Sequence, residues 1–298
     1  MTAVQAENQE RTVQGVYAPG PEHWVGDGFH VRTVFWPDRG AKALSPFLLL
    51  DHGATRHFDP TDTPRGVDEH PHRGFETVTF AFEGEVDHKD SAGGGGRIGP
   101  GDVQWMTAGS GVVHEEKHSR AFTETGGDFS MIQLWVNLPA KLKMTPPRYQ
   151  ALTDDLFPRI DLDVATARII AGSISGTQGP AKTHSPITVL DVMFSEKGEV
   201  SIPLPPQWTT IAFCFEGEGW AGEDKQAIAS RHFAIFDPEQ GDTVVIGGHP
   251  GSRILLLAGQ PLDEPVVAYG PFVMNTSEEI RQAMVDYQRG AMGQIVRQ

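Results

Sequence analysis

The chain has 298 residues, of which 39% are hydrophobic, with 34 glycines, 22 prolines and a formal net charge of -15 at pH 7. This length allows two domains of ordinary size, and the glycine and proline content is typical of all-β proteins rich in turns. The negative charge argues against a broad basic surface for nucleic acid or for an anionic membrane. Cys214 is the single cysteine, so it cannot form an internal disulfide, which favours a reducing compartment.

The N-terminal segment is polar, lacks the apolar core of a signal peptide, and is followed by no apolar run of membrane-spanning length. We therefore expect a soluble, cytoplasmic protein that makes no direct contact with nucleic acid or membrane. Residues 1 to about 25 are polar or turn-forming, which predicts a poorly ordered tail or an edge strand. Apolar runs at 29–35 and 47–50 predict two strands. Residues 51–69 are rich in turn formers, so we expect a surface connection there.

Two pairs of side chains with metal-binding character follow. His70 and His72 point the same way if they lie on a strand, because side chains alternate between its two faces. His114 and Glu116 also share a face, whereas Glu115 points to the other. One His-x-His is weak evidence, since the chain has 12 histidines. Two such pairs are stronger, and three imidazoles with one carboxylate suit a borderline divalent metal with open coordination positions.

The segment between these pairs predicts strands and a hairpin. Residues 75–85 alternate and end at a turn, and further strands are predicted at 98–106 and 131–136. The glycines at 93–96 predict a flexible hairpin tip. A phosphate-binding loop is given little weight because no Gly-Lys-Ser/Thr ending and no helical pattern follow these glycines.

Several neighbours of the two pairs have two interpretations. Glu76 has the parity of the first histidine pair, so a continuous strand would point it toward the metal. We favour a role near the site for Glu76 over a buried salt bridge or hydrogen bond. His118 has the parity of the second pair but lies further along, and we expect it to be exposed. Trp105 and Met106 are interpreted as core residues rather than pocket-lining ones.

Five segments resemble motifs of the pirin family, which belongs to the cupin superfamily: 70–79 (HPHRGFETVT), 99–109 (GPGDVQWMTAG), 113–116 (VHEE), 137–149 (NLPAKLKMTPPRY) and 265–276 (PVVAYGPFVMNT). The likeness covers most of the chain from about residue 30 onward. It implies that the four metal ligands are His70, His72, His114 and Glu116, which is also the set that strand parity selects.

An internal repeat predicts two similar barrels. Residues 75–85 and 208–218 share Thr, Phe, Phe, Glu, Gly and Glu at matched positions, and a later Gly-Asp pair opens a strand in each half. Two such units, joined through the proline-rich stretch 139–158, imply two β-barrels in one chain. The pirin resemblance implies that both are cupin barrels of the jelly-roll type.

The second repeat lacks the metal ligands. The first histidine pair aligns with Pro203 and Pro205, neither of which can bind a metal, and His249 is interpreted as a loop residue. We therefore predict an all-β fold of two tandem cupin barrels, with a metal-binding barrel at 1–145 and a barrel without ligands at 146–298.

A short helix is predicted at the C-terminus. Residues 276–279 (TSEE) form a capping box, and Ile280, Ala283, Met284 and Tyr287 fall on one face of a helix that ends near Gly290. We expect the apolar face of this helix to pack on a barrel.

The resemblance also implies a function. Some pirins resemble quercetinases, cupins that open a flavonol ring with dioxygen and release carbon monoxide. We predict a dioxygenase of this kind with one divalent metal ion, Fe(II) being favoured and Ni, Co, Cu, Mn and Zn being alternatives. Glu116 would be both a ligand and the base for the flavonol 3-hydroxyl. Two alternatives stay open: a non-enzymatic, metal- or redox-responsive regulator that acts through a protein partner, and a storage or structural metalloprotein.

Overall fold

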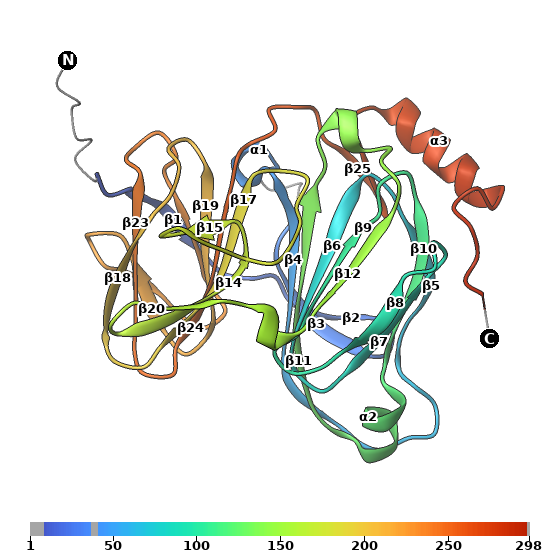
Figure 1. Cartoon of the computed structure of the whole chain (residues 1–298), viewed down its shortest axis with the longest axis horizontal. Helices are drawn as coiled ribbons and strands as arrows, with labels where there is room; N and C mark the ends of the chain where they lie inside the picture. The colour runs from blue at the N-terminus through green and yellow to red at the C-terminus, as the bar shows by residue number, and fades with distance from the viewer. Residues whose placement is uncertain (1–8, 37–40, 297–298) are drawn as a thin grey trace. The chain divides into compact units, whose positions relative to one another are not determined.

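The computed structural model describes residues 9–36 and 41–296, which form two compact units made mostly of strands (Figure 1). The histidine barrel comprises Gly20–Lys42, Pro46–Leu156 and Leu262–Gln298. The apolar barrel comprises Met1–Pro19, Ala43–Ser45 and Phe157–Pro261. Each unit contains a seven-stranded and a four-stranded sheet, which confirms the expected all-β fold.

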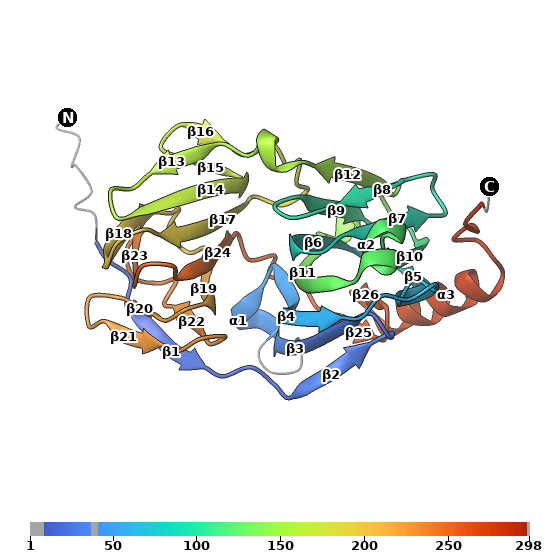
Figure 2. The same ribbon diagram turned by 90° about the horizontal axis from the view of Figure 1, so that it is seen from below.

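The grouping of the chain differs from the expected boundary between residues 145 and 146. The N-terminal residues belong to the apolar barrel because β1 (Val13–Tyr17) pairs with β22 (Phe233–Phe236), as Figure 2 shows. The chain beyond residue 261 belongs to the histidine barrel, where the C-terminal hairpin and helix pack. Strand pairing therefore assigns the N-terminal segment to the barrel formed mainly by the second half of the chain. Apolar contacts assign the C-terminal segment to the barrel formed mainly by the first half.

The histidine barrel has sheets of order β12-β9-β6-β11-β4-β3-β2 and β5-β10-β7-β8. Their strands are β2 (Glu22–Val25), β3 (Phe29–Phe35), β4 (Phe47–Phe58), β5 (Gly66–His72), β6 (Phe75–Glu83), β7 (Val86–Asp90), β8 (Gly95–Ile98), β9 (Val103–Thr107), β10 (Val112–His118), β11 (Gly127–Asn137) and β12 (Arg148–Leu152). Short helical segments occupy connections: α1 (Ala41–Leu44), α2 (Arg120–Thr125), η2 (Ala140–Leu142) and η3 (Asp154–Leu156).

The apolar barrel has sheets of order β1-β22-β19-β24-β17-β14-β13 and β18-β23-β20-β21. Its remaining strands are β13 (Arg159–Asp161), β14 (Ala165–Ala171), β15 (Ser173–Ile174), β16 (Thr177–Gln178), β17 (Ile187–Phe194), β18 (Gly198–Pro203), β19 (Thr209–Glu216), β20 (Gly219–Ala221), β21 (Gln226–Ile228), β23 (Thr243–Gly248) and β24 (Arg253–Gly259). The order β22-β19-β24-β17-β14 matches β9-β6-β11-β4-β3 strand for strand. The repeated sequence lies on β6 and β19, so the predicted internal repeat is a structural repeat as well.

The interiors of the two barrels differ in chemistry. The apolar barrel is filled by aliphatic side chains with Phe194, Phe236 and the buried Cys214. The histidine barrel has an apolar floor, which includes Phe29, Phe58 and Phe129. Above that floor its inner face becomes polar, and this difference decides which barrel can hold a metal.

Two predictions about the first 70 residues need correction or refinement. The turn-rich connection expected over 51–69 is shorter, because β4 continues to Phe58 and β5 begins at Gly66. The long β4 persists because it pairs with β11 along almost its whole length. The expectation of an edge strand within residues 1–25 is met twice, by β1 and by β2, while residues 1–8 lie outside the described part of the chain.

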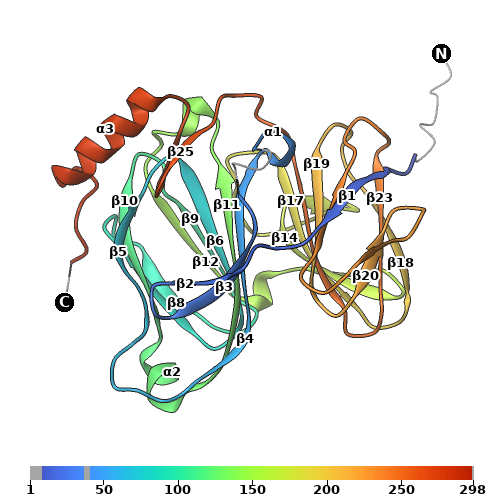
Figure 3. The same ribbon diagram turned by 180° about the vertical axis from the view of Figure 1, so that it is seen from behind.

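The C-terminal helix α3 (Ser277–Gln288) begins with the predicted capping box, in which Thr276 and Glu279 bond each other's backbone N–H groups. Its buried residues, Ile280 and Ala283, pack with Val113 of β10, so the helix covers the outside of the histidine barrel (Figure 3). The hairpin of β25 (Val267–Tyr269) and β26 (Phe272–Met274) precedes it. No helix in the described ranges is long and apolar enough to cross a membrane.

Lys143 fastens this hairpin to the turn between β5 and β6. Its ammonium is buried and donates to the Gly74 carbonyl at 2.8 Å, the Val273 carbonyl at 2.9 Å and Asn137 Oδ1 at 2.7 Å. Three donors therefore meet three acceptors from parts of the barrel that are far apart in sequence.

Replacing Lys143 by Met should destabilise the protein by about 3 kcal/mol, because buried carbonyl oxygens lose their donor and unsatisfied polar groups cost about 1–3 kcal/mol each. Urea denaturation followed by fluorescence would measure the change. The matched control is Lys141→Met, since Lys141 lies in the adjoining η2 segment and is exposed. Equal stability of the two variants would contradict the role given to Lys143.

Candidate metal centre

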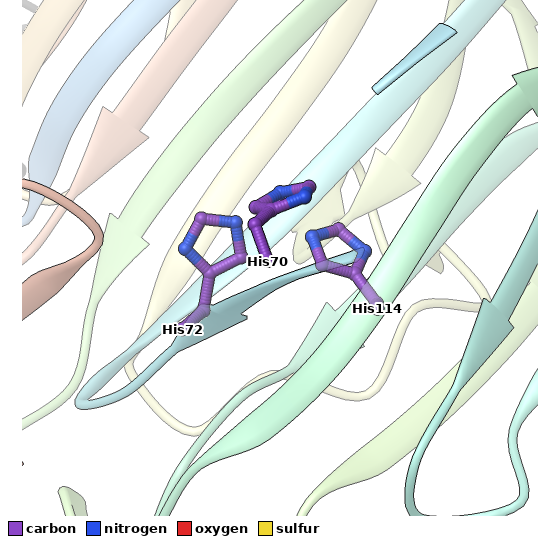
Figure 4. Close-up of side chains that lie close together, drawn as sticks. All are labelled: His70, His72 and His114. Carbon is purple, nitrogen blue, oxygen red and sulfur yellow. The ribbon is translucent and has the colours of Figure 1, made fainter. Parts of the chain in front are cut away.

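The register between β5 and β10 brings three histidines together. His114 lies opposite His70, and Val112 lies opposite His72. The ring centroids of His70 and His114 are 4.3 Å apart, and that of His72 lies 4.8 Å from each. Figure 4 shows the three imidazoles gathered side by side. Each ring offers a nitrogen within 4.8 Å of the other two, which is compatible with a shared metal ion.

Hydrogen bonds fix which nitrogen two of these rings can offer. His70 Nδ1 lies 2.7 Å from the Asp68 carbonyl, and His72 Nδ1 lies 3.3 Å from the Pro271 carbonyl. A carbonyl only accepts, so both Nδ1 atoms carry hydrogen and both Nε2 atoms keep a lone pair. His114 Nε2 is buried and has no hydrogen-bond partner among the described residues. A metal would satisfy this buried nitrogen, so the histidine set fits the predicted ion.

Burial also keeps two of the rings in the neutral form that binds metals. Desolvation, and then the neighbouring His70, lower the pKa of His72 and of His114 well below the ordinary value. Neutral imidazole is the ligand form, so no proton competes for these nitrogens near neutral pH.

Glu116 lies beside His114 in a second group of potential ligand atoms that also contains His88. Its carboxylate accepts hydrogen bonds from Gln104 at 2.9 Å, Thr79 at 3.3 Å and Gln133 at 3.1 Å. The structure thus places Glu116 next to the three-histidine cluster, and its assignment as the fourth ligand stays a prediction.

The three donors to Glu116 come from one row of the seven-stranded sheet. Strand pairing aligns Gln104 with Thr79, and Thr79 with Gln133. The next row on the same face aligns Met106 with Thr77 and Trp135, because side chains on one face recur every two residues. Gln104, Thr79 and Gln133 therefore form a polar row under the Glu116 carboxylate. The row of Met106, Thr77 and Trp135 beside it is more apolar.

Trp135 brings this apolar row to the histidines. Its ring lies 5.3 Å from the His72 ring and 4.3 Å from that of Phe75. Trp36 extends the aromatic group, with its ring 5.8 Å from that of Trp135. The cluster therefore adjoins an aromatic wall on the side of His72.

Sequence analysis missed His88, Gln104 and Gln133. His88 and Asp90 form a further pair with period two on β7, and that spacing was the signal that could have found them. Pairing with β10 places His88 opposite Glu116, and Asp90 opposite His114. The glutamines are single polar residues in apolar strands, and only the register shows that they reach Glu116.

Glu76 does not face the histidines. Gly74 has a φ of 89° between β5 and β6, so the strand is not continuous and the parity count fails there. Glu76 instead accepts a hydrogen bond from Thr107 at 2.6 Å, and Arg148 lies 4.0 Å away. Of the buried salt bridge or hydrogen bond weighed as the alternative, the hydrogen bond describes this residue, and the favoured role near the site is not supported.

His118 is buried, so the prediction that it is exposed is wrong. Its ring lies among Phe58, Phe122 and Phe129 in the apolar floor, and its Nε2 is 3.0 Å from the Gly28 carbonyl. Burial lowers the pKa of His118 to about 4. The parity count was correct in direction, since His118 points inward as His114 does, but at a deeper level of the barrel.

The remaining sequence interpretations concern core residues and the second barrel. Trp105 and Met106 are both fully buried. In the apolar barrel, Pro203 ends β18, and His249 is exposed in the turn after β23. Within residues 9–36 and 41–296, the groups of side chains suited to a metal lie in the histidine barrel alone.

Comparisons with known proteins agree with this arrangement. The family model described as Pirin matches residues 28–136, and that of the Pirin C-terminal cupin domain matches residues 189–293. A Pseudomonas aeruginosa protein named "Putative quercetin 2,3-dioxygenase" is 46% identical over 282 residues, which covers 94% of this chain and 98% of that protein. Human pirin is 38% identical over 257 residues, which covers 85% of this chain and 84% of human pirin. The crystal structure of quercetin 2,3-dioxygenase from Acinetobacter baumannii has a TM-score of 0.92 at 46% identity and covers 96% of this chain and 100% of that one.

Substituting His72 or His114 by Ala should abolish stoichiometric metal binding while the protein stays folded, because each variant removes one nitrogen of the cluster and leaves both barrel cores. Elemental analysis after reconstitution would give the metal content, and circular dichroism would report the fold. His57→Ala is the control, since His57 is exposed and pairs with Asp128 on the surface. Full metal content in both cluster variants would refute the site.

Glu76 should make stability depend on pH. Burial raises the pKa of Glu76 to about 7 from 4.5, against the lowering effect of the Thr107 hydrogen bond. The folded state therefore holds a proton that the unfolded state releases between pH 4.5 and 7, so stability falls as pH rises through this window. The shift corresponds to about 3 kcal/mol.

Glu76→Gln should remove this part of the pH dependence. The difference in unfolding free energy between variant and wild type should change by about 3 kcal/mol from pH 4.5 to pH 8, in favour of the variant. Urea denaturation at a series of pH values measures it, with Glu124→Gln on an exposed helix as the control. Parallel profiles for wild type and Glu76→Gln would contradict the protonated state of this residue.

Proposed function

The chain belongs to the pirin family, and from this we propose that it is a mononuclear metal enzyme that opens quercetin-type flavonols with dioxygen. The observation that carries the proposal is the convergence of His70, His72 and His114 beside a hydrogen-bonded Glu116. Relatives at 46% identity named as quercetin 2,3-dioxygenases support the choice of substrate class.

His70, His72, His114 and Glu116 would hold the metal, for which we propose Fe(II). The bound ion would supply Lewis acidity and redox chemistry to an enolisable substrate and dioxygen. The two histidines whose Nδ1 atoms donate to backbone carbonyls keep their rings in a set orientation, which a metal site needs.

Glu116 is the proposed base for the flavonol 3-hydroxyl. Gln104, Gln133 and Thr79 all donate to its oxygens, and an ionised carboxylate, which only accepts, is the form that matches three donors. The proton of the substrate hydroxyl would move to a Glu116 oxygen. The same hydrogen bonds hold the carboxylate at a fixed distance from His114, so the base is positioned before the substrate binds.

The aromatic wall fits a flat, aromatic substrate. Trp135 and Phe75 lie next to the His72 ring, and Trp135, the more exposed of the two, would contact a bound polyphenol. Aromatic side chains there also exclude water from the reacting end of the substrate, which strengthens the electrostatic effect of nearby charges.

Aerobic turnover of quercetin by protein reconstituted in parallel with iron, nickel, cobalt, copper and manganese tests the proposal. We expect loss of flavonol absorbance together with release of carbon monoxide. Glu116→Gln should lower the rate about 10²- to 10⁴-fold, the usual contribution of a general base. Glu115→Gln is the matched control, because Glu115 precedes Glu116 in β10 and points to the other face of the strand.

Absence of turnover with every verified metal load would count against the enzyme. Metal-dependent binding of a protein partner in place of turnover would then favour the regulator that the sequence left open.

A further inference from the structure

A buried chain of side chains extends from the histidine cluster toward the β7–β8 hairpin. His88 Nδ1 lies 3.3 Å from His114 Nδ1, and His88 Nε2 lies 3.3 Å from Asp90 Oδ2. All three residues are almost completely buried. His70 and His72 have no such extension, because they bond backbone carbonyls directly. His114 is thus the member of the cluster whose outer nitrogen depends on other side chains.

Asp90 sets the donor and the acceptor in the hydrogen bonds that link it to His88 and His114. Its Oδ1 accepts from the backbone N–H groups of Ala92 and Gly94, both at 2.8 Å, and its Oδ2 faces His88. A carboxylate only accepts, so His88 Nε2 must donate. Gln104 Nε2, which only donates, lies 3.2 Å from the other ring nitrogen, so His88 Nδ1 is an acceptor. His114 Nδ1 must therefore donate to it, which leaves the lone pair of His114 on Nε2.

We propose that Asp90 and His88 are positioning residues that fix the tautomer of His114, so that its buried Nε2 is available to the metal. The inference rests on the metal site of the proposed function. Hydrogen-bonded partners of this kind orient metal-binding histidines and set which nitrogen is protonated. Here a second histidine transmits the effect of the carboxylate.

Tyr149 and Gln104 contact His88 and hold it in place. The Tyr149 ring stacks on His88 at 4.8 Å with an interplanar angle of 19°. Gln104 Nε2 is 3.2 Å from His88 Nδ1 and also donates to Glu116, so it ties the chain to the proposed base.

One residue of the glycine run, Gly94, has a structural role beside Asp90. A Cβ on Gly94 would lie 2.3 Å from Asp90 Oδ2 and 2.8 Å from Tyr149 Cβ. Any side chain there would displace Asp90 or Tyr149. Gly94 therefore provides the space in which the Asp90 carboxylate reaches His88, a requirement that a flexible hairpin tip would not impose.

Asp90→Asn reverses the hydrogen bonds between Asp90, His88 and His114, and it leaves Gln104 bonded to Glu116 but no longer to His88. The backbone donors of Ala92 and Gly94 retain the amide oxygen, so the amide N–H faces His88 Nε2. His88 must then accept at Nε2 and carry its hydrogen on Nδ1. His114 Nδ1 becomes the acceptor, and its hydrogen moves to Nε2, where it blocks metal binding.

Two measurements follow from this reversal. In the metal-free protein, ¹⁵N chemical shifts of labelled histidines should show His114 protonated at Nδ1 in the wild type and at Nε2 in Asp90→Asn. The metal affinity of Asp90→Asn, measured by competition with a chelator, should fall about 10- to 100-fold. Asp87→Asn should change neither, since Asp87 lies on the same strand but pairs with Arg97 at the surface.

His88→Gln provides a rescue. Its amide can accept from His114 and donate to Asp90, so the wild-type tautomer and most of the affinity should remain, whereas His88→Leu should lose affinity. The inference is wrong if His114 stays protonated at Nδ1 in Asp90→Asn, or if the tautomer changes and the affinity does not. A wild-type protein that binds no metal would refute the proposed function instead, and the ¹⁵N shifts of the metal-free protein would still decide the tautomer.

Discussion

The site depends on the register between three antiparallel strands. Pairing of β5, β10 and β7 sets His70 opposite His114, His114 opposite Asp90, and Glu116 opposite His88. Because the side-chain period is two, a slip of one residue in β10 would turn these groups away from the barrel and bring their neighbours in. The cluster, the carboxylate beside it and the hydrogen bonds behind it therefore share a single geometric origin.

The same topology carries chemistry in one barrel and not in the other. Both barrels share the strand order around β6 and β19, yet the core of the apolar barrel consists mainly of aliphatic and aromatic side chains. In the histidine barrel, polar residues occupy one row of the inner face above an apolar floor. Function thus follows from which inner positions are polar, not from the fold itself.

Strand parity and the repeat in the sequence predicted the two barrels and brought three histidines and Glu116 to one region. The parity argument failed at Glu76, because Gly74 interrupts the strand with a backbone conformation that a residue count cannot detect. Parity also does not indicate how deep in the barrel a residue lies. His118 was therefore expected to be exposed, although its ring packs against Phe129 in the apolar floor. Sequence patterns did not predict the roles of His88, Gln104 and Gln133, because their partners lie on other strands. The register between strands cannot be derived from the sequence of one strand.

The position of the hairpin and helix after residue 261 has a consequence for biosynthesis. The Pro271 carbonyl that orients His72, and the Val273 carbonyl that binds Lys143, are both translated after the whole apolar barrel. On the ribosome the histidine barrel emerges first, but it stays incomplete until these residues follow. The later barrel can therefore finish folding before the earlier one, since the histidine barrel lacks two of its hydrogen bonds until the last part of the sequence is translated.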